Sequence, residues 1–165
     1  MIDVSTLAFI PGTSAGPLDP QWVEHTQRLV GHAFDPEYLA FMGRQNGGPL
    51  RRRYLPVNGN VKVVERFLCL VDPRANPAEA IYDVGAVWSL IGARIGPSRV
   101  PFAVLFPGDF LCFDHGRPGP PSVVWWKHEA RPGATSEPIP VAPSFTALLD
   151  ALRLESEVAR PGVGA

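Results

Sequence analysis

The sequence predicts an α+β fold in which helices pack around a mainly antiparallel sheet of about five to six strands. Between 100 and 128, three apolar runs are separated by a Pro-Gly-Asp turn and a loop rich in proline and glycine, which is typical of consecutive antiparallel strands. Asn58-Gly59 joins two further β-rich runs and is a strong hairpin dipeptide. Stretches with apolar residues at helical spacing flank these runs, so the helices surround the sheet.

Length and composition favour one globular domain. The chain has 165 residues, of which 45% are hydrophobic and 19% charged, which is too apolar for disorder. We assign 1–155 to a single domain and 156–165 to a flexible tail. The net charge of -1 provides no whole-molecule field for nucleic acid or membrane binding. With no membrane-spanning run and no secretory signal apparent, we expect a cytoplasmic location.

Two helices are predicted in the first third of the chain. Asp19-Pro20 supplies a cap followed by proline at the first helical position, which predicts a helix from about 20 to 33. Asp35-Pro36 repeats this start for a shorter helix. Asn46-Gly47-Gly48 ends that helix, because asparagine and glycine tolerate the left-handed conformation; a phosphate-binding loop is disfavoured, since a strand before it and a lysine are missing.

The middle of the chain predicts a hairpin and a third helix. The hairpin arms are 53–57 and 61–71, and Pro56 makes the first arm an edge strand. Asn76-Pro77, with Glu79 three residues after the asparagine, resembles a capping box that starts a helix ending near Gly92.

The last third predicts three strands, a loop and a helix. The strands are 100–106, 109–114 and 122–128, and the proline-rich segment 130–143 is expected to be an extended surface loop. Ser144 caps the final helix.

The two cysteines lie in apolar runs. We predict that Cys69 and Cys112 are reduced core thiols, while a disulfide between them stays open because the sequence does not show whether they are close.

Several polar groups allow a chemical and a structural interpretation. Asp114-His115 and His128-Glu129 could form a metal or acid–base site, but adjacent strand residues face opposite sides of the sheet. The structural interpretation is that Asp109 and Asp114 cap turns. Arg51 to Arg53 could bind phosphate, but the run is short, and a solvated segment is favoured. We predict no catalytic residues, no metal ligands and no cofactor.

Trp125-Trp126 are consecutive residues of one predicted strand, so one ring should enter the core and the other should point away. The outward ring is either covered by a helix or serves as an interface anchor.

The chain resembles the Smi1/Knr4 (SUKH) superfamily over residues 20 to 153. The resemblance is carried by these residues: Pro36, Tyr38, Phe41, Asn46, Gly47, Gly48, Pro101, Phe102, Ala103, Gly108, Asp109, Phe113, Asp114, His128 and Glu129. The order of the elements also fits. The chain departs from the family pattern in the insertion at 115–121 and in the apolar Val104-Leu105-Phe106.

The resemblance implies a SUKH-like, helix-flanked sheet without enzymatic activity. Bacterial members are mostly immunity proteins, so we expect the partner to be a cognate toxin. The alternative is a regulatory or scaffold module like the fungal members, and a small metal-dependent hydrolase is disfavoured. If the toxin is a nuclease, carboxylates would face its basic cleft. The predicted partner-binding residues are Asp109, Asp114, Trp125, Trp126 and Glu129.

Overall fold

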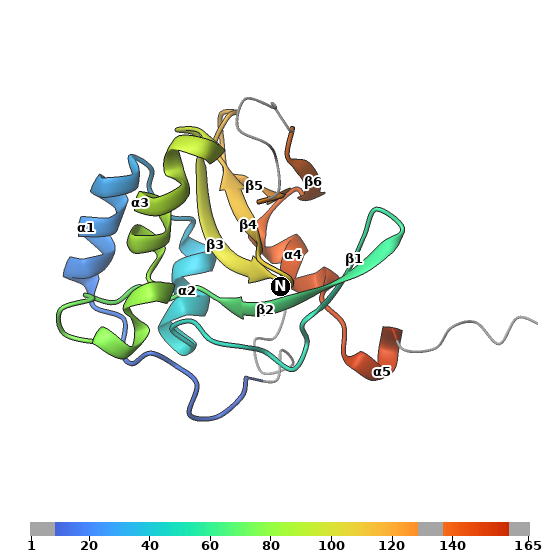
Figure 1. Ribbon diagram of the computed structural model, residues 1–165, viewed down its shortest axis with the longest axis horizontal. Helices are drawn as coiled ribbons and strands as arrows, with labels where there is room; N and C mark the ends of the chain where they lie inside the picture. Colours follow the sequence, from blue (N-terminus) through green and yellow to red (C-terminus); the bar gives the residue numbers. More distant parts are fainter. Residues whose placement is uncertain (1–8, 129–136, 159–165) are drawn as a thin grey trace, which may run out of the picture.

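The computed structural model describes residues 9–128 and 137–158. A six-stranded antiparallel sheet with strand order β1-β2-β3-β4-β5-β6 forms its centre, and helices lie on both faces (Figure 1), which confirms the predicted fold class. The strands are β1 (Tyr54–Val57), β2 (Asn60–Phe67), β3 (Arg99–Leu105), β4 (Asp109–Asp114), β5 (Ser122–Trp126) and β6 (Ile139–Ala142). The helices are α1 (Pro20–Val30), α2 (Pro36–Arg44), the 3₁₀ helix η2 (Pro77–Tyr82), α3 (Val84–Ile95), α4 (Phe145–Ala151) and α5 (Glu155–Val158).

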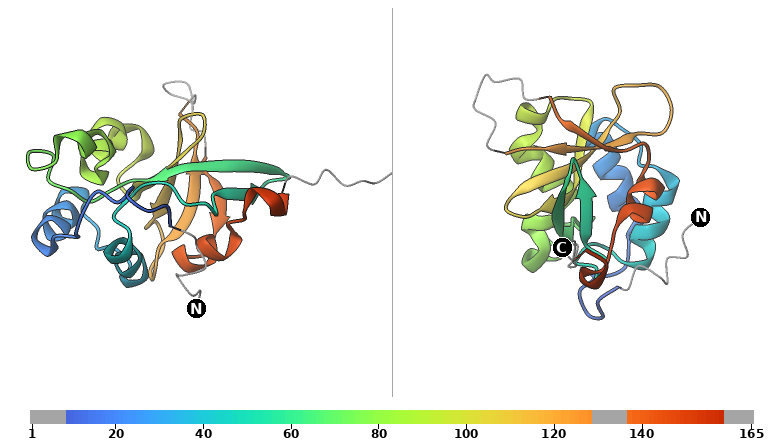
Figure 2. Two further views of the ribbon diagram at one scale, coloured as in Figure 1. Left: turned by 90° about the horizontal axis from the view of Figure 1, so that it is seen from below. Right: turned by 90° about the vertical axis from the view of Figure 1, so that its right-hand side faces the viewer.

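One face of the sheet, the α2–α4 face, carries the larger core. Tyr38 of α2 and Phe145 of α4 meet Phe102 and Phe113 of the sheet, with ring centroids 5.0 to 6.1 Å apart. All four side chains are at most 1% exposed. Aromatic side chains bury a large apolar area, so this cluster fixes how the two helices sit on the sheet. Figure 2 shows α2 and α4 on the side opposite α3.

The other face, the α3 face, has a smaller core. Ile95 of α3 packs on Cys112, Val124 and Trp126. Cys112 and Cys69 are both buried and free, so the predicted reduced core thiols are confirmed. Burial raises the pKa of the Cys69 thiol to about 12, and it also raises the pKa of Cys112, so neither sulfur is a ready nucleophile.

Three of the predicted helix starts are confirmed. Asp19 accepts a hydrogen bond from Gln21 N, Asp35 from Glu37 N, and Ser144 from Ala147 N. These side chains satisfy amides that the first helical turn leaves without a partner. No helix in the described ranges is long and apolar enough to cross a membrane.

The predicted start of the third helix is wrong. Asn76 makes no capping bond, and the segment after it is the 3₁₀ helix η2. α3 begins instead at Val84, where the buried Asp83 accepts from Ala86 N. The second oxygen of Asp83 accepts from Val71 N and from Trp22 of α1. The start of α3 is therefore set by hydrogen bonds that Asp83 accepts from two other segments of the chain. A local sequence pattern does not reveal such bonds.

One prediction near the C-terminus needs correction, and part of the predicted tail can be described. Within the expected loop 130–143, Ile139–Ala142 forms strand β6 and pairs with β5. The sequence analysis missed this strand because Pro140 weakens the strand pattern. An edge strand nevertheless tolerates a proline. In the expected tail, α5 covers the first residues, and Glu157 forms an ion pair with Arg52, with a nitrogen–oxygen distance of 3.1 Å. The rest of the tail, 159–165, lies outside the described residues.

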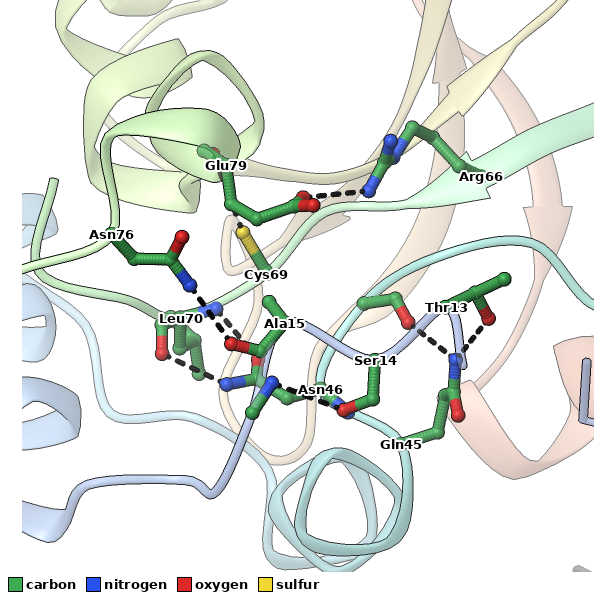
Figure 3. A network of polar contacts seen from close by, with 12 residues as sticks. Thr13, Ser14, Ala15, Gln45, Asn46, Arg66, Cys69, Leu70, Asn76 and Glu79 are labelled. Atoms are coloured by element: carbon green, nitrogen blue, oxygen red, sulfur yellow. Dashed lines mark hydrogen bonds and ion pairs between the residues drawn. The ribbon is translucent and has the colours of Figure 1, made fainter. Parts of the chain in front are cut away.

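α2 ends at Arg44 and its C-cap residue Gln45 is extended, so the left-handed helix end predicted at Asn46-Gly47-Gly48 is wrong. The triplet follows the helix and makes tertiary contacts instead (Figure 3). The Asn46 side chain, 1% exposed, donates to the Leu70 carbonyl at 3.1 Å and accepts from Leu70 N at 2.8 Å. Gly48 exchanges two backbone bonds with Phe67, both 2.9 Å. A Cβ on Gly47, whose φ is +76°, would lie 2.8 Å from the Cβ of Cys69. The turn therefore clamps the end of α2 to the chain that leaves β2.

The same turn also holds the segment before α1 (Figure 3). Asn46 N donates to Ser14 Oγ at 3.2 Å, and Gln45 Nε2 donates to Thr13 Oγ1 at 2.9 Å. Ala15 accepts from the side chain of Asn76 at 2.9 Å. Three stretches distant in sequence therefore share one set of polar contacts, and we name it the Asn46 clamp.

Replacing Asn46 with alanine should lower the free energy of unfolding by about 2–4 kcal/mol, because the buried amide and carbonyl of Leu70 lose their partners. Urea denaturation measures this loss. Asn60→Ala, at an exposed strand position, is the matched control and should change stability by less than about 0.5 kcal/mol. Equal effects of the two substitutions would contradict the clamp.

Candidate functional site

The candidate site is the turn end of the sheet, which we define as the outer part of β2 (60–63), the β3–β4 turn (106–108) and the residues that border them, Asp109, Lys127 and His128. Asp109 starts β4 and is 8% exposed. Its carboxylate accepts from Trp125 Nε1 at 2.8 Å, from His128 N at 3.0 Å and from His128 Nδ1 at 2.7 Å. The carboxylate thereby fixes the end of β5 against β4.

These bonds set the charge state of Asp109. Burial alone would raise the pKa of this carboxyl, but the hydrogen bonds from His128 and Trp125 outweigh burial and hold the pKa below its usual value. Among the described residues, no serine, threonine or cysteine side chain hydrogen-bonds His128. The Asp109–His128 pair therefore has a structural role: it holds the end of β5 against β4. The carboxylate also orients the half-exposed imidazole of His128.

Trp125 lies on the α2–α4 face at this end and is 5% exposed. The ammonium groups of Lys62 and Lys127 lie 4.7 and 4.9 Å from the centroid of its ring. Cation–π attraction of this kind holds both ammonium groups close to one indole ring. The ring itself is a support for charged groups and is not an exposed anchor.

Trp126 lies on the α3 face and is 4% exposed. The expected outward ring is therefore covered by a helix, since Ile95 packs on it and the guanidinium of Arg94 lies 5.0 Å from its centroid. The two rings therefore face opposite sides of the sheet, as predicted, and of the two alternatives for the outward ring the structure shows the helix cover. Their predicted role in partner binding is not tested by this packing and stays a prediction.

Asp114 lies at the opposite end of β4 from Asp109. It accepts from Gly116 N at 2.8 Å, which confirms the predicted turn cap, and its Oδ2 lies 3.6 Å from Arg99 Nε. Glu129 is outside the described residues. The predicted partner-binding residues are thus not one surface: Asp109 and Trp125 are in contact, whereas Trp126 and Asp114 lie elsewhere.

The two histidines of the considered metal site are also far apart along the strands. His128 follows β5 at the turn end, whereas His115 follows β4 at the other end and stacks on His32, with centroids 4.2 Å apart and planes at 8°. Burial, and then His32, lowers the pKa of His115. No group of three or more potential ligands that could hold a metal ion occurs in the described part of the chain.

The arginine run does not form a single basic surface. Arg52 donates from two nitrogens to the carboxylate of Glu157 and from one to Leu152 O, and Arg51 is exposed. A guanidinium held by a carboxylate is a poor phosphate ligand, which favours the structural interpretation.

An apolar strip on the α3 face was missed by the sequence analysis. Strand alternation places Val63 and Val104 on this face, because their neighbours Val64 and Leu105 are buried on the other. Phe106 N donates to Val63 O and therefore lies beside it. The strip consists of Pro56, Val61, Val63, Val104, Phe106 and Phe110, and all of these are half-buried or exposed. The alternation of apolar and polar residues in 60–67 could have indicated that part of the strip which lies on β2.

Both edges of the sheet are closed to a further strand. On β1, Tyr54 N and O bond to Arg153, at 3.1 and 2.8 Å, and the next outward position is Pro56, which has no N–H. On β6, Pro140 interrupts the outer edge in the same way. A partner would therefore meet a face or an end of this sheet and would not extend it.

Comparison with known proteins identifies the class. The family model described as SMI1 / KNR4 family (SUKH-1) matches residues 17–151. The chain therefore belongs to the SMI1/KNR4 family, as the Asn-Gly-Gly turn and the Pro-Phe-Ala strand predicted. No curated protein matches the chain.

Replacing Asp109 with alanine should lower the free energy of unfolding by about 2–4 kcal/mol, since the buried indole N–H of Trp125 and the amide of His128 lose their acceptor. Asp150→Ala, at an exposed position of α4, is the control. Equal urea midpoints for the two variants would contradict this structural role of Asp109.

Acidification should destabilise the protein through His115. Its pKa is lower in the folded state, so the unfolded state binds the proton more readily and the stability is lost as the pH falls through about 6.5. His115→Phe keeps a stacked ring without a proton site and should flatten the stability profile between about pH 7 and 5. Parallel profiles for the variant and the wild type would show that this histidine is not responsible.

Proposed function

We propose that this protein is an immunity protein, which binds a cognate toxin stoichiometrically and blocks its action. The proposal goes beyond family membership to the role of the bacterial members that the chain resembles. Such a role needs a rigid surface of roughly 800 Å² on each partner and no chemistry of its own.

One observation carries the proposal: a preformed apolar strip remains open on a sheet whose two edges are closed. Phe106 is 61% exposed and Val61 is 47% exposed, although most large apolar side chains of the described chain are buried. A contiguous exposed apolar patch on a globular domain marks an interaction site, whereas a single exposed apolar side chain does not. The supports beneath the surface, Asp109 with Trp125 and His128, are already in place, so little ordering is needed on binding.

Co-expression provides the test. We expect the adjacent reading frame to encode the toxin domain. This domain, expressed alone, should arrest growth, and the present protein should restore growth and co-purify with it at a 1:1 ratio. A non-cognate toxin domain is the control and should not be neutralised. A complex without restored growth would favour a regulatory module, and a folded, well-expressed protein that gives neither complex nor growth would contradict the proposal.

A further inference from the structure

The turn end carries exposed apolar side chains on its α3 face and positive charge on its α2–α4 face. Phe106 and Val61 are its exposed apolar groups. Lys62 and Lys127 converge on the indole of Trp125 from β2 and from the end of β5. Neither lysine forms an ion pair with any described residue.

The carboxylates of the described residues do not cancel this charge. The Asp109 carboxylate is buried and already accepts three hydrogen bonds. Glu65, the next acid along β2, lies at the bulge between Val64 and Arg66, closer to the body of the sheet. Among the described residues, the α2–α4 face of the turn end is therefore cationic and its α3 face is apolar, although the whole chain carries a charge of -1.

We infer that the turn end inserts into a groove of the toxin, with Lys62 and Lys127 against an acidic wall and Phe106 in an apolar recess on the opposite side. This inference rests on the proposed function and names the chemistry of its partner. It reverses the polarity expected from the sequence, in which Asp109 and Asp114 were to face a basic cleft. Asp109 is buried beneath the lysines, and Asp114 caps a turn at the far end of β4 beside Arg99.

Two other occupants fit the surface less well. A symmetric dimer through the turn end would set the lysines of one copy against those of the other, because such an interface uses the same patch twice. Single-stranded nucleic acid needs several aromatic faces open to successive bases. Among the described Phe, Tyr and Trp side chains of the turn end only Phe106 is exposed, whereas the Trp125 and Trp126 rings are 5% and 4% exposed. An acidic protein surface satisfies both the lysines and the apolar groups.

Binding kinetics with the purified toxin domain from the adjacent reading frame test the inference. The double variant Lys62→Glu/Lys127→Glu should slow association at least about tenfold at low salt, because charge steering is reversed. Phe106→Ala should speed dissociation by about tenfold or more, because the anchor is lost. Arg44→Glu/Arg117→Glu makes the same change in net charge at exposed positions away from the turn end and should bind like the wild type. Thermal unfolding confirms that each variant is folded.

The outcomes separate this inference from the proposed function. Wild-type binding that neither turn-end variant alters overturns the inference and leaves the immunity role intact. A wild type that does not bind the toxin overturns both. Self-association of the free protein that Phe106→Ala abolishes, or binding of a single-stranded oligonucleotide that the double lysine variant abolishes, would assign the turn end to another partner and overturn the inference.

Discussion

The fold depends on one buried constraint, the pairing of the Asn46 side chain with the backbone of Leu70. An unsatisfied buried amide is costly, so this pairing fixes where the chain leaves β2 and thereby where Asp83 can start α3. Gly47 allows the required close approach, because any Cβ there would collide with Cys69. Helices on opposite faces of the sheet are thus positioned from a single turn, and the sheet between them keeps a defined shape up to the turn end.

Much of this fold follows from local sequence. Aspartate–proline pairs and Ser144 set three helix starts, and Asn58-Gly59 sets the hairpin, because each works through its own neighbours. Two wrong predictions, the start of the third helix and the missed strand β6, have a common cause. The start of α3 depends on bonds from Asp83 to Val71 and Trp22, and β6 exists because β5 offers it an edge. Contacts between distant segments cannot be detected as a pattern along the chain.

The site was less predictable than the fold. The sequence correctly drew attention to Asp109 and Trp125, but the carboxylate turned out to be an internal acceptor for the indole and for His128. The groups beside them, the exposed Phe106 and Lys127 and the half-buried Lys62, come from three different parts of the chain and share no sequence motif. Only the register of the sheet brings them together, so a motif indicated the supporting residues, whereas the surface they support required the structure.

The central claim is that a rigid, cationic and apolar end of the sheet is the part of this SMI1/KNR4 domain that meets a toxin. Hydrogen exchange of the free protein and of its toxin complex tests it most directly. The account predicts slower exchange on binding at 60–63, at 106–109 and at 127–128, with little change in α1 or in the loop at 115–121. Slower exchange confined to α1 or to that loop would contradict it.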